Sequence, residues 1–334
     1  MRKGFQDTVL RDRYGRAVTY LRVSVTDRCN LRCFYCLPRG DHECTRREQL
    51  SLGELAEVVR VGVGLGISKI RITGGEPLVR PGVVDLVREL SRQSPDADLA
   101  LSTNGTLLAE HAAALRAAGL RRVNVSLDSL RPAVFRAISG RNDLDRVLAG
   151  IAAAHATGLH PIKLNVVVMR GVNDAEMPAM LEFGAAGGAQ VRFIEYMPLG
   201  LGQRWETSYV SGHEMLERLR AYLASDAPRS GPGDTATYYA LRGGGEVGVI
   251  SPVSCRFCSC CNRLRLTADG RLRPCLTSEG EVDVRPALRP RSSTDAVAQC
   301  FRAATAGRPQ QGTYETEPQR RLVHQGRSMV AIGG

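Results

Sequence analysis

The sequence predicts an α/β fold built on a parallel sheet, either doubly wound or curved into a partial (β/α)6 barrel. Short runs rich in β-branched residues alternate with longer runs of helical character through the first two thirds of the 334 residues. Serine, proline and glycine stand where several of these runs begin or end, as they do at helix termini. Hydrophobic residues at 43% and charged residues at 24% are ordinary for a globular chain with a core.

Six strand–helix units are expected in series. The strands are expected at Tyr20–Thr26, Lys69–Thr73, Leu99–Ser102, Arg122–Leu127, Lys163–Met169 and Val191–Glu195. The helices are expected at Glu54–Gly64 with Ser51 as its cap, Gly82–Leu90 opened by Pro81, Leu108–Ala118 stopped by Gly119, a short one around Ala133–Ala137, Asp145–Ala156, and one from about Ala175 to Ala185. In either type of sheet, ligands bind at the carboxyl ends of the strands.

The alternation ends after Tyr196, so we expect a domain over residues 1–200 and a second region over 201–334. Further elements are expected as a helix near Met215–Tyr222, a surface loop at Ser225–Thr235, short strands at Tyr238–Leu241 and Val247–Ile250, and a hairpin of Arg263–Thr267 with Arg271–Cys275. The Arg-rich stretch Pro286–Arg327, with a helix expected around Ala296–Ala304, receives no chemistry.

The net charge of +11 indicates an anionic partner, either nucleic acid or a phosphorylated small molecule. Aromatic residues are only 5% and arginine forms no long run, which favours the small molecule over nucleic acid. No apolar run approaches the roughly 20 residues that span a bilayer, and no signal peptide is expected. The ten cysteines are therefore expected to be metal ligands in the reducing cytoplasm.

Three closely spaced cysteines, Cys29, Cys33 and Cys36, follow the first expected strand. Three thiolates can bind three irons of a [4Fe–4S] cube and leave the fourth iron open for a substrate, whereas an electron carrier closes its cluster with a fourth ligand. The neighbouring Phe34 and Tyr35 are expected to keep water away. The alternative is a zinc site completed by His42 or Cys44, but structural zinc usually uses two separated pairs of ligands.

Thr73–Pro77, with its glycine pair, follows the second expected strand. Two glycines let the backbone approach a ligand, and exposed amides and carbonyls can bind the charged end of an amino acid. The alternative is an ordinary turn between strand and helix.

A second group of cysteines lies near the expected hairpin. Cys255, Cys258, Cys261 and Cys275 could close a zinc or iron–sulfur site, or the last three alone could hold a cluster with an open iron, and the spacing does not decide between them. Arg263 and Arg265 alternate on a strand, so their side chains point to one side and could bind phosphate; the alternative is a solvated face.

These motifs together resemble those of a known family. The Cys-x3-Cys-x2-Cys motif and the Gly-Gly-Glu turn resemble those of radical S-adenosylmethionine (SAM) enzymes, and Phe257–Leu276 resembles the C-terminal signature of the molybdenum-cofactor biosynthesis protein A family, which are GTP 3′,8-cyclases. The resemblance covers nearly the whole chain, with Pro286–Arg327 the poor match. It extends to Asp12–Cys36, Asn124–Ser129, Lys163–Asp174, Arg192–Met197 and the closing Gly333–Gly334.

The resemblance implies a partial (β/α)6 TIM-like barrel of the radical SAM type, with a C-terminal region that carries an auxiliary iron–sulfur cluster. It implies two [4Fe–4S] clusters, held by Cys29, Cys33 and Cys36 and by Cys258, Cys261 and Cys275, the second of which binds guanine. It implies SAM contacts by Tyr35, Gly75, Ser126 and Met197. It implies GTP contacts by Arg22, Arg71, Ser102 (where threonine is more usual), Lys163, Arg263, Leu264 and Arg265. Arg192 is a further candidate near the substrate, and Arg192, Arg263 and Arg265 are the expected catalytic residues.

The implied activity is that of a lyase: the cyclisation of GTP to (8S)-3′,8-cyclo-7,8-dihydro-GTP, the first step of molybdenum cofactor (molybdopterin) biosynthesis. Cleavage of SAM gives a 5′-deoxyadenosyl radical that removes hydrogen from C3′, and the carbon radical then attacks C8. The expected partners are an external electron donor, a pyranopterin-forming enzyme and a second copy of the chain, with no nucleic acid or membrane. The alternatives are another radical SAM enzyme acting on a peptide or RNA, and a non-enzymatic zinc or iron–sulfur nucleic-acid module. No role is assigned to Cys255 or Cys260.

Overall fold

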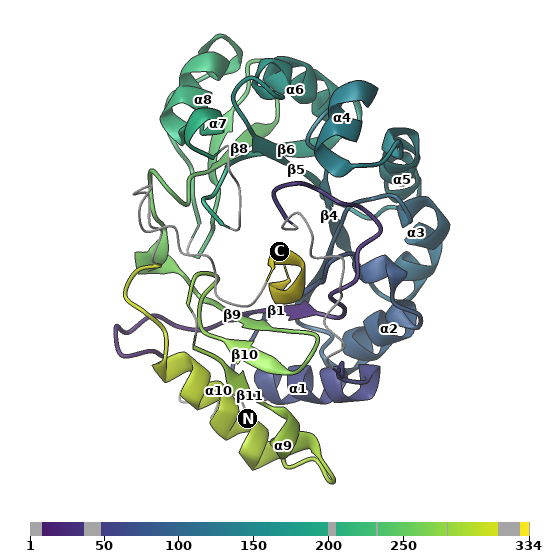
Figure 1. Cartoon of the computed structure of the whole chain (residues 1–334), viewed down its shortest axis with the longest axis vertical. Helices are drawn as coiled ribbons and strands as arrows, with labels where there is room; N and C mark the ends of the chain where they lie inside the picture. Colours follow the sequence, from purple (N-terminus) through teal and green to yellow (C-terminus); the bar gives the residue numbers. More distant parts are fainter. Residues whose placement is uncertain are drawn as a thin grey trace.

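The strands of this chain form one curved sheet with helices on its outer side (Figure 1). The structure is a computed structural model that describes residues 9–36, 48–199, 205–231, 233–278, 280–312 and 328–333. Within them the sheet has 11 strands in the order β11-β10-β9-β1-β2-β3-β4-β5-β6-β8-β7. The six central strands are parallel and follow the chain in sequence, so the predicted α/β fold with a partial (β/α)6 barrel is confirmed.

The elements of the barrel lie within a few residues of the expected ones. Its strands are β1 (Tyr20–Ser24), β2 (Lys69–Thr73), β3 (Asp98–Thr103), β4 (Arg122–Ser126), β5 (Ile162–Val168) and β6 (Ala189–Glu195). Its helices are α1 (Leu52–Gly64), α2 (Val83–Gln93), α3 (Leu108–Ala117), α4 (Pro132–Ser139), α5 (Leu144–Ala156) and α6 (Met177–Ala186). The predicted cap is confirmed, because Ser51 and Glu54 form a capping box that satisfies orphan amides at the start of α1.

The C-terminal strands extend the sheet at both edges. β9 (Arg263–Leu266) pairs in parallel with β1, and β8 (Glu246–Ile250) pairs in parallel with β6. Antiparallel partners follow on the outside: β7 (Thr237–Ala240) beside β8, and β10 (Arg271–Arg273) then β11 (Val282–Asp283) beside β9. The predicted hairpin is thus confirmed as β9–β10. The division into residues 1–200 and 201–334 stays a prediction, since the sheet is continuous across it.

The remaining helices flank the C-terminal strands. They are α7 (Trp205–Ser208), α8 (Gly212–Leu219), α9 (Arg285–Leu288) and α10 (Thr294–Ala306), the last of which confirms the helix expected around Ala296–Ala304. A short 3-10 helix at Met329–Ile332 lies inside the ring of strands (Figure 1). No helix in the described part of the chain is long and apolar enough to cross a membrane.

Alternation along each strand separates the core from the inner face of the barrel. On β5, Ile162, Leu164 and Val166 are buried in the hydrophobic core beneath the helices, while Lys163 and Asn165 point to the other side. The same alternation holds on the neighbouring strands, so the inner face of the barrel carries polar side chains.

Candidate active site

Three arginines lie side by side on the inner face. In the registers of the paired strands, Arg22 on β1 is the partner of Arg71 on β2 and also of Arg265 on β9. Burial, and next the charge of Arg265, lower the pKa of Arg22 well below its usual value. Burial likewise lowers the pKa of Arg265 to about 10. Like charges held this close and away from water favour a polyanionic ligand, since only opposite charge relieves the repulsion.

Tyr20 lies among these cations and was not singled out from the sequence. The guanidinium carbons of Arg71 and Arg263 lie 6.0 and 5.7 Å from the centre of its ring. Burial alone would raise the pKa of Tyr20, but Arg71, Arg22 and Arg263 outweigh it and lower that pKa to about 8. The available signal was its position two residues before Arg22, which puts both side chains on one face of a strand.

The other side of the inner face carries the remaining residues expected to contact GTP. Arg71 donates a hydrogen bond to the Ser102 hydroxyl at 3.4 Å. Lys163 donates to the Tyr238 hydroxyl at 3.0 Å. The Nε of Arg192 donates to Asn165 Oδ1 at 3.0 Å. Ser102, Lys163 and Arg192 therefore face the same space as the arginines of β1, β2 and β9.

Leu264 differs from the other residues of this set. Its side chain is fully buried in the hydrophobic core, on the opposite side of β9 from Arg263 and Arg265. Any contact of Leu264 with a ligand on the inner face must come from its backbone.

Asn124 on β4 also faces inward, between Ser102 and Lys163 in the strand registers, and was not selected as an individual residue. Its side chain is buried, and its Oδ1 accepts no hydrogen bond from the part of the chain that the structure describes. A buried acceptor without a donor costs about 1–3 kcal/mol, so such an atom indicates a place where a ligand or water donates.

The C-terminal segment lies across the arginines. The carbonyl oxygen of Gly333 accepts hydrogen bonds from Arg22 at 3.2 Å and from Arg265 at 2.8 Å. Gly333 has a φ of +73°, and a Cβ there would lie 3.0 Å from Thr73 Cγ2 and 3.1 Å from Ser24 Cβ, so glycine suits this position. Gly334 lies outside the described residues. Although Pro286–Arg327 is a poor match to the family, Gly333 lies on the inner face of the barrel.

Cys29, Cys33 and Cys36 lie in the loop after β1 and are partly buried. Burial raises the pKa of all three thiols, and mutual repulsion adds to this for Cys33 and Cys36. Three thiolates are therefore unfavourable here unless cations neutralise them, and irons of a cluster would do so. The Leu31 amide and the Asn104 side chain donate to Cys29 Sγ at 3.4 and 3.8 Å, as suits a thiolate ligand. The trio fits the expected cluster.

The alternative zinc ligands His42 and Cys44 lie outside the described residues. Within the described residues, no group of three or more His, Cys, Asp or Glu side chains is placed to hold a single metal ion. Of the two aromatic residues expected to exclude water, Phe34 is 38% exposed. Tyr35 is less exposed than Phe34, and its ring meets that of Tyr196 edge-on, with the ring centres 6.4 Å apart.

A buried carboxylate holds Tyr35 in place. The Tyr35 hydroxyl donates to Asp128 Oδ2 at 2.6 Å, and the Val167 amide donates to Asp128 Oδ1 at 2.8 Å. Burial raises the pKa of Asp128 to about 6. The charge of Asp128 also raises the pKa of Cys33 and Cys36, which makes it an electrostatic neighbour of the first cysteine group. Asp128 lies within the stretch Asn124–Ser129 but was not selected as an individual residue.

The glycine pair after β2 has a packing reason. A Cβ on Gly75 would lie 2.4 Å from the Arg28 carbonyl oxygen, and one on Gly74 would lie 2.6 Å from that of Thr26. The turn therefore packs directly against the backbone that leads to Cys29.

Glu76 ties this turn to the loop after β3. It is fully buried and accepts hydrogen bonds from the Thr103 hydroxyl at 2.7 Å and the Asn104 amide at 2.6 Å. Burial raises its pKa to about 7. The remaining residues expected to contact SAM are Ser126, exposed at the carboxyl end of β4, and Met197, half-buried after β6.

Two cysteines of the second group, Cys258 and Cys275, lie beside Gly312. The Gly312 amide donates to Cys258 Sγ at 3.4 Å, and a Cβ on Gly312 would lie 3.7 Å from Cys275 Sγ. Arg263 lies 4.0 Å from Cys261 Sγ. Burial alone would raise the pKa of Cys261, but Arg263 and Arg308 lower it, which favours a thiolate. These three cysteines are partly buried and fit a cluster, whereas the side chains of Cys255 and Cys260 are exposed.

The chain matches two family models: the Radical SAM superfamily over residues 23–184 and Molybdenum Cofactor Synthesis C over residues 189–314. It is 42% identical to a GTP 3′,8-cyclase from Alkaliphilus oremlandii over 328 residues, which are 97% of this chain and 100% of the relative. It is 46% identical to a GTP 3′,8-cyclase from Heliobacterium modesticaldum over 313 residues, 90% of this chain and 93% of the relative. Among solved structures, SuiB from Streptococcus suis bound to S-adenosylmethionine is similar in fold. Its TM-score is 0.61 at 11% identity, with 85% of this chain and 65% of that chain covered.

Proposed function

The chain belongs to the GTP 3′,8-cyclase family of radical SAM enzymes, and we propose that the inner face of its barrel binds GTP between two iron–sulfur clusters. It is an enzyme of the first step of molybdenum cofactor biosynthesis, and it uses SAM and a [4Fe–4S] cluster. When bound, the cluster and SAM supply a 5′-deoxyadenosyl radical. The residues of the chain bind, orient and shield the reactants.

We infer that the triphosphate of GTP binds to the arginines of β1, β2 and β9. Arg22, Arg71 and Arg265 are adjacent in register, and burial lowers the pKa of each, with the charge of Arg265 adding to the shift of Arg22. A triphosphate supplies the opposite charge and several acceptors for guanidinium donors. This alignment of three cations on neighbouring strands is the observation that carries the substrate assignment.

We infer that the nucleoside part of GTP lies near Ser102 and Asn124. Phosphate at neutral pH offers acceptors only, so a GTP group that donates to the buried Asn124 oxygen would belong to the ribose or to guanine. Lys163 and Arg192, on the next two strands, bound this space on the far side. The proposed orientation thus places the phosphates at β9, β1 and β2 and the ribose toward β3 to β6.

We propose that the SAM cluster binds to Cys29, Cys33 and Cys36, with SAM between Gly75, Ser126, Tyr35 and Met197. These residues follow β1, β2, β4 and β6 at their carboxyl ends, where α/β barrels bind ligands. Asp128 fixes the orientation of Tyr35 through a hydrogen bond of 2.6 Å. Tyr35 and Tyr196 would then help to exclude water from the radical.

We propose an auxiliary [4Fe–4S] cluster on Cys258, Cys261 and Cys275, with a fourth iron that no cysteine binds. The partial burial of these three thiols and the exposure of Cys255 favour the set of three over the set of four. Arg263, which contacts Cys261 and stacks 5.3 Å from the ring centre of Phe257, connects this group to the cationic face. An open iron there would take the base of a nucleotide whose phosphates bind Arg22 and Arg265.

The proposed partners follow from the chemistry. The reductive cleavage of SAM consumes an electron, so an external one-electron donor must bind. The cyclised nucleotide must pass to an enzyme that rearranges it to a pyranopterin. The structural likeness to SuiB, at 11% identity, concerns the fold alone and favours no peptide substrate.

The experiment is an anaerobic incubation of reconstituted protein with SAM, GTP and dithionite, with products identified by mass spectrometry. We expect a nucleotide isomeric with GTP, formed together with 5′-deoxyadenosine. Cys29→Ala should abolish the cleavage of SAM, and Cys258→Ala should abolish the isomer. Deoxyadenosine formed at the same rate with and without GTP would contradict the substrate assignment.

A further inference from the structure

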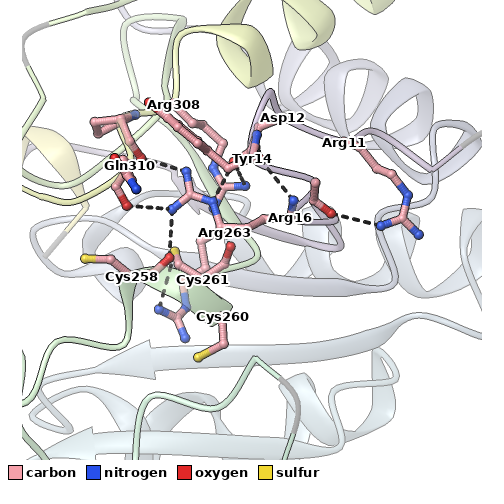
Figure 2. Close-up of polar contacts among 12 residues, drawn as sticks. Arg11, Asp12, Tyr14, Arg16, Cys258, Cys260, Cys261, Arg263, Arg308 and Gln310 are labelled. Carbon is pink, nitrogen blue, oxygen red and sulfur yellow. Dashed lines mark hydrogen bonds and ion pairs between the residues drawn. The ribbon is translucent and has the colours of Figure 1, made fainter.

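A buried group of three charged side chains lies beside Cys258 and Cys261 of the second cysteine group (Figure 2). Asp12 Oδ2 accepts hydrogen bonds from Arg16 Nε at 2.7 Å and from Arg308 Nη1 at 2.9 Å. The exposed fractions of the side chains are 0% for Asp12, 9% for Arg16 and 2% for Arg308. We call these three residues the buried charge cluster.

The two arginines of the buried charge cluster bind the loop that carries two of the cysteines. Arg16 donates to the Cys258 carbonyl oxygen at 2.7 Å, and Arg308 donates to the Cys261 carbonyl oxygen. Arg16 also donates to the carbonyl oxygen of Pro309 at 2.6 Å. Three segments far apart in the sequence therefore meet at these cysteines, as Figure 2 shows.

The charges in this cluster do not balance. The cluster contains two guanidiniums, of Arg16 and Arg308, and one carboxylate, of Asp12, so it carries one net positive charge that is buried away from water. Burying such a charge is expensive unless an anion compensates for it. Hydrogen bonds from Arg16 outweigh the burial of Asp12 and keep its pKa below the usual value, so the carboxylate stays ionised at neutral pH. The further acceptors of the two arginines are the carbonyl oxygens of Cys258 and Cys261, so the excess positive charge lies beside these cysteines, and the charge of Arg308 lowers the pKa of Cys261.

We propose that Arg308, held in place by Asp12, raises the reduction potential of the auxiliary cluster; this inference rests on the proposed binding of that cluster to Cys258, Cys261 and Cys275. One-electron reduction by an external donor adds one negative charge to the site. A positive charge that water does not screen stabilises the reduced state more than the oxidised state. Arg308 is a positioning residue in this proposal, because it contacts the cysteine loop and not the substrate.

The test uses the full chain with Cys29, Cys33 and Cys36 replaced by alanine, so that only the auxiliary site can load iron. In this background we compare Arg308→Met, Arg308→Lys and Asp12→Asn, with Arg302→Met as the control because Arg302 is exposed on α10. After anaerobic reconstitution, the iron content of each variant is measured. A redox titration followed by electron paramagnetic resonance then gives the reduction potential.

Loss of the Arg308 charge and loss of the Asp12 carboxylate should move the reduction potential of the auxiliary cluster in opposite directions. Arg308→Met should decrease the ratio of reduced to oxidised cluster at a fixed potential about tenfold, a shift of about 59 mV toward more negative values for one electron. Asp12→Asn should shift the potential upward. In Arg308→Lys and in the control, the ratio of reduced to oxidised cluster at the same potential should remain within about threefold of the parent value.

The outcomes separate this inference from the proposed function. A parent chain that binds no iron would contradict the auxiliary cluster itself. A parent that binds iron but whose potential is unchanged in Arg308→Met would overturn the role of Arg308 alone. Equal downward shifts in Arg308→Met and Asp12→Asn would indicate a merely structural role. If Asp12→Asn does not load iron, the comparison of Arg308→Met with Arg308→Lys decides between charge and structure.

Discussion

Arg22 and Arg265 donate hydrogen bonds to one atom, the carbonyl oxygen of Gly333, from neighbouring parallel strands. The two strands come from opposite ends of the chain, so their pairing brings the N-terminal and C-terminal halves of the cationic face together. The same two guanidiniums are the ones that we assign to the triphosphate of GTP.

Arg265→Met should weaken the binding of GTP by about 10- to 100-fold, because a hydrogen bond to a charged group contributes about 1.5–3 kcal/mol. Equilibrium dialysis under anaerobic conditions measures the dissociation constants for GTP and for SAM. The binding of SAM should be unchanged. Arg88→Met, at an exposed position of α2, serves as the control. An equal loss of affinity for GTP and SAM would indicate general damage to the barrel and contradict the assignment.

Asn124→Leu should weaken the binding of GTP about tenfold but leave the binding of inorganic tripolyphosphate unchanged. The substitution removes the buried acceptor with little change in volume, and tripolyphosphate has no group that donates to it. Competition with labelled GTP measures both ligands. Arg265→Met should weaken both, which makes it the matched comparison. If Asn124→Leu weakened the binding of GTP and of tripolyphosphate equally, Asn124 would lie beside the phosphates instead.

Tyr20 should ionise near pH 8, two pH units below an ordinary tyrosine, because the surrounding arginines stabilise the phenolate. The pKa in the folded state lies below the unfolded value of 10.0, so this ionisation stabilises the folded state progressively between pH 8 and pH 10. The ultraviolet absorbance of tyrosinate should rise in this range, and the step should be absent in Tyr20→Phe. The phenolate also opposes a bound triphosphate. The affinity for GTP should therefore fall above pH 8 in the parent but not in Tyr20→Phe.

The contribution of Glu76 to the free energy of unfolding should decrease as the pH rises from 4.5 to 7. Burial raises its pKa from 4.5 to about 7, so the folded protein keeps a proton that the unfolded chain has lost. The contribution to the free energy of unfolding that is lost over this window is about 3 kcal/mol. Urea unfolding at the two pH values should show a smaller decrease in Glu76→Gln. Glu182→Gln, at an exposed position of α6, should keep the parental decrease; an unchanged decrease in Glu76→Gln would contradict the prediction.

The sequence predicted those parts of the site that depend on local spacing. The alternation of Arg263 and Arg265 placed both side chains on one face of a strand, as observed, whereas the two sets of cysteine ligands stay predictions. Leu264, for which the resemblance implied a contact with GTP, has its side chain in the core, on the opposite side of the strand.

The parts that sequence reasoning missed depend on which strands and loops meet. Tyr20 becomes unusual only because β9 brings Arg263 beside it, and that pairing joins segments from the two ends of the chain. Arg308 lies in a polar stretch to which the sequence assigned no chemistry, and its role follows from contacts with Asp12 and Cys261. No periodicity or spacing within a single segment records such contacts.

The most direct test of the proposed function follows one hydrogen atom from the substrate. The protein is incubated anaerobically with SAM, dithionite and GTP that carries deuterium at C3′, and the released 5′-deoxyadenosine is examined by mass spectrometry. The deoxyadenosine should gain one deuterium, and the cyclised nucleotide should form in proportion to it. Deoxyadenosine without deuterium, released while GTP remains unchanged, would contradict the claim that this barrel holds C3′ of GTP against the radical.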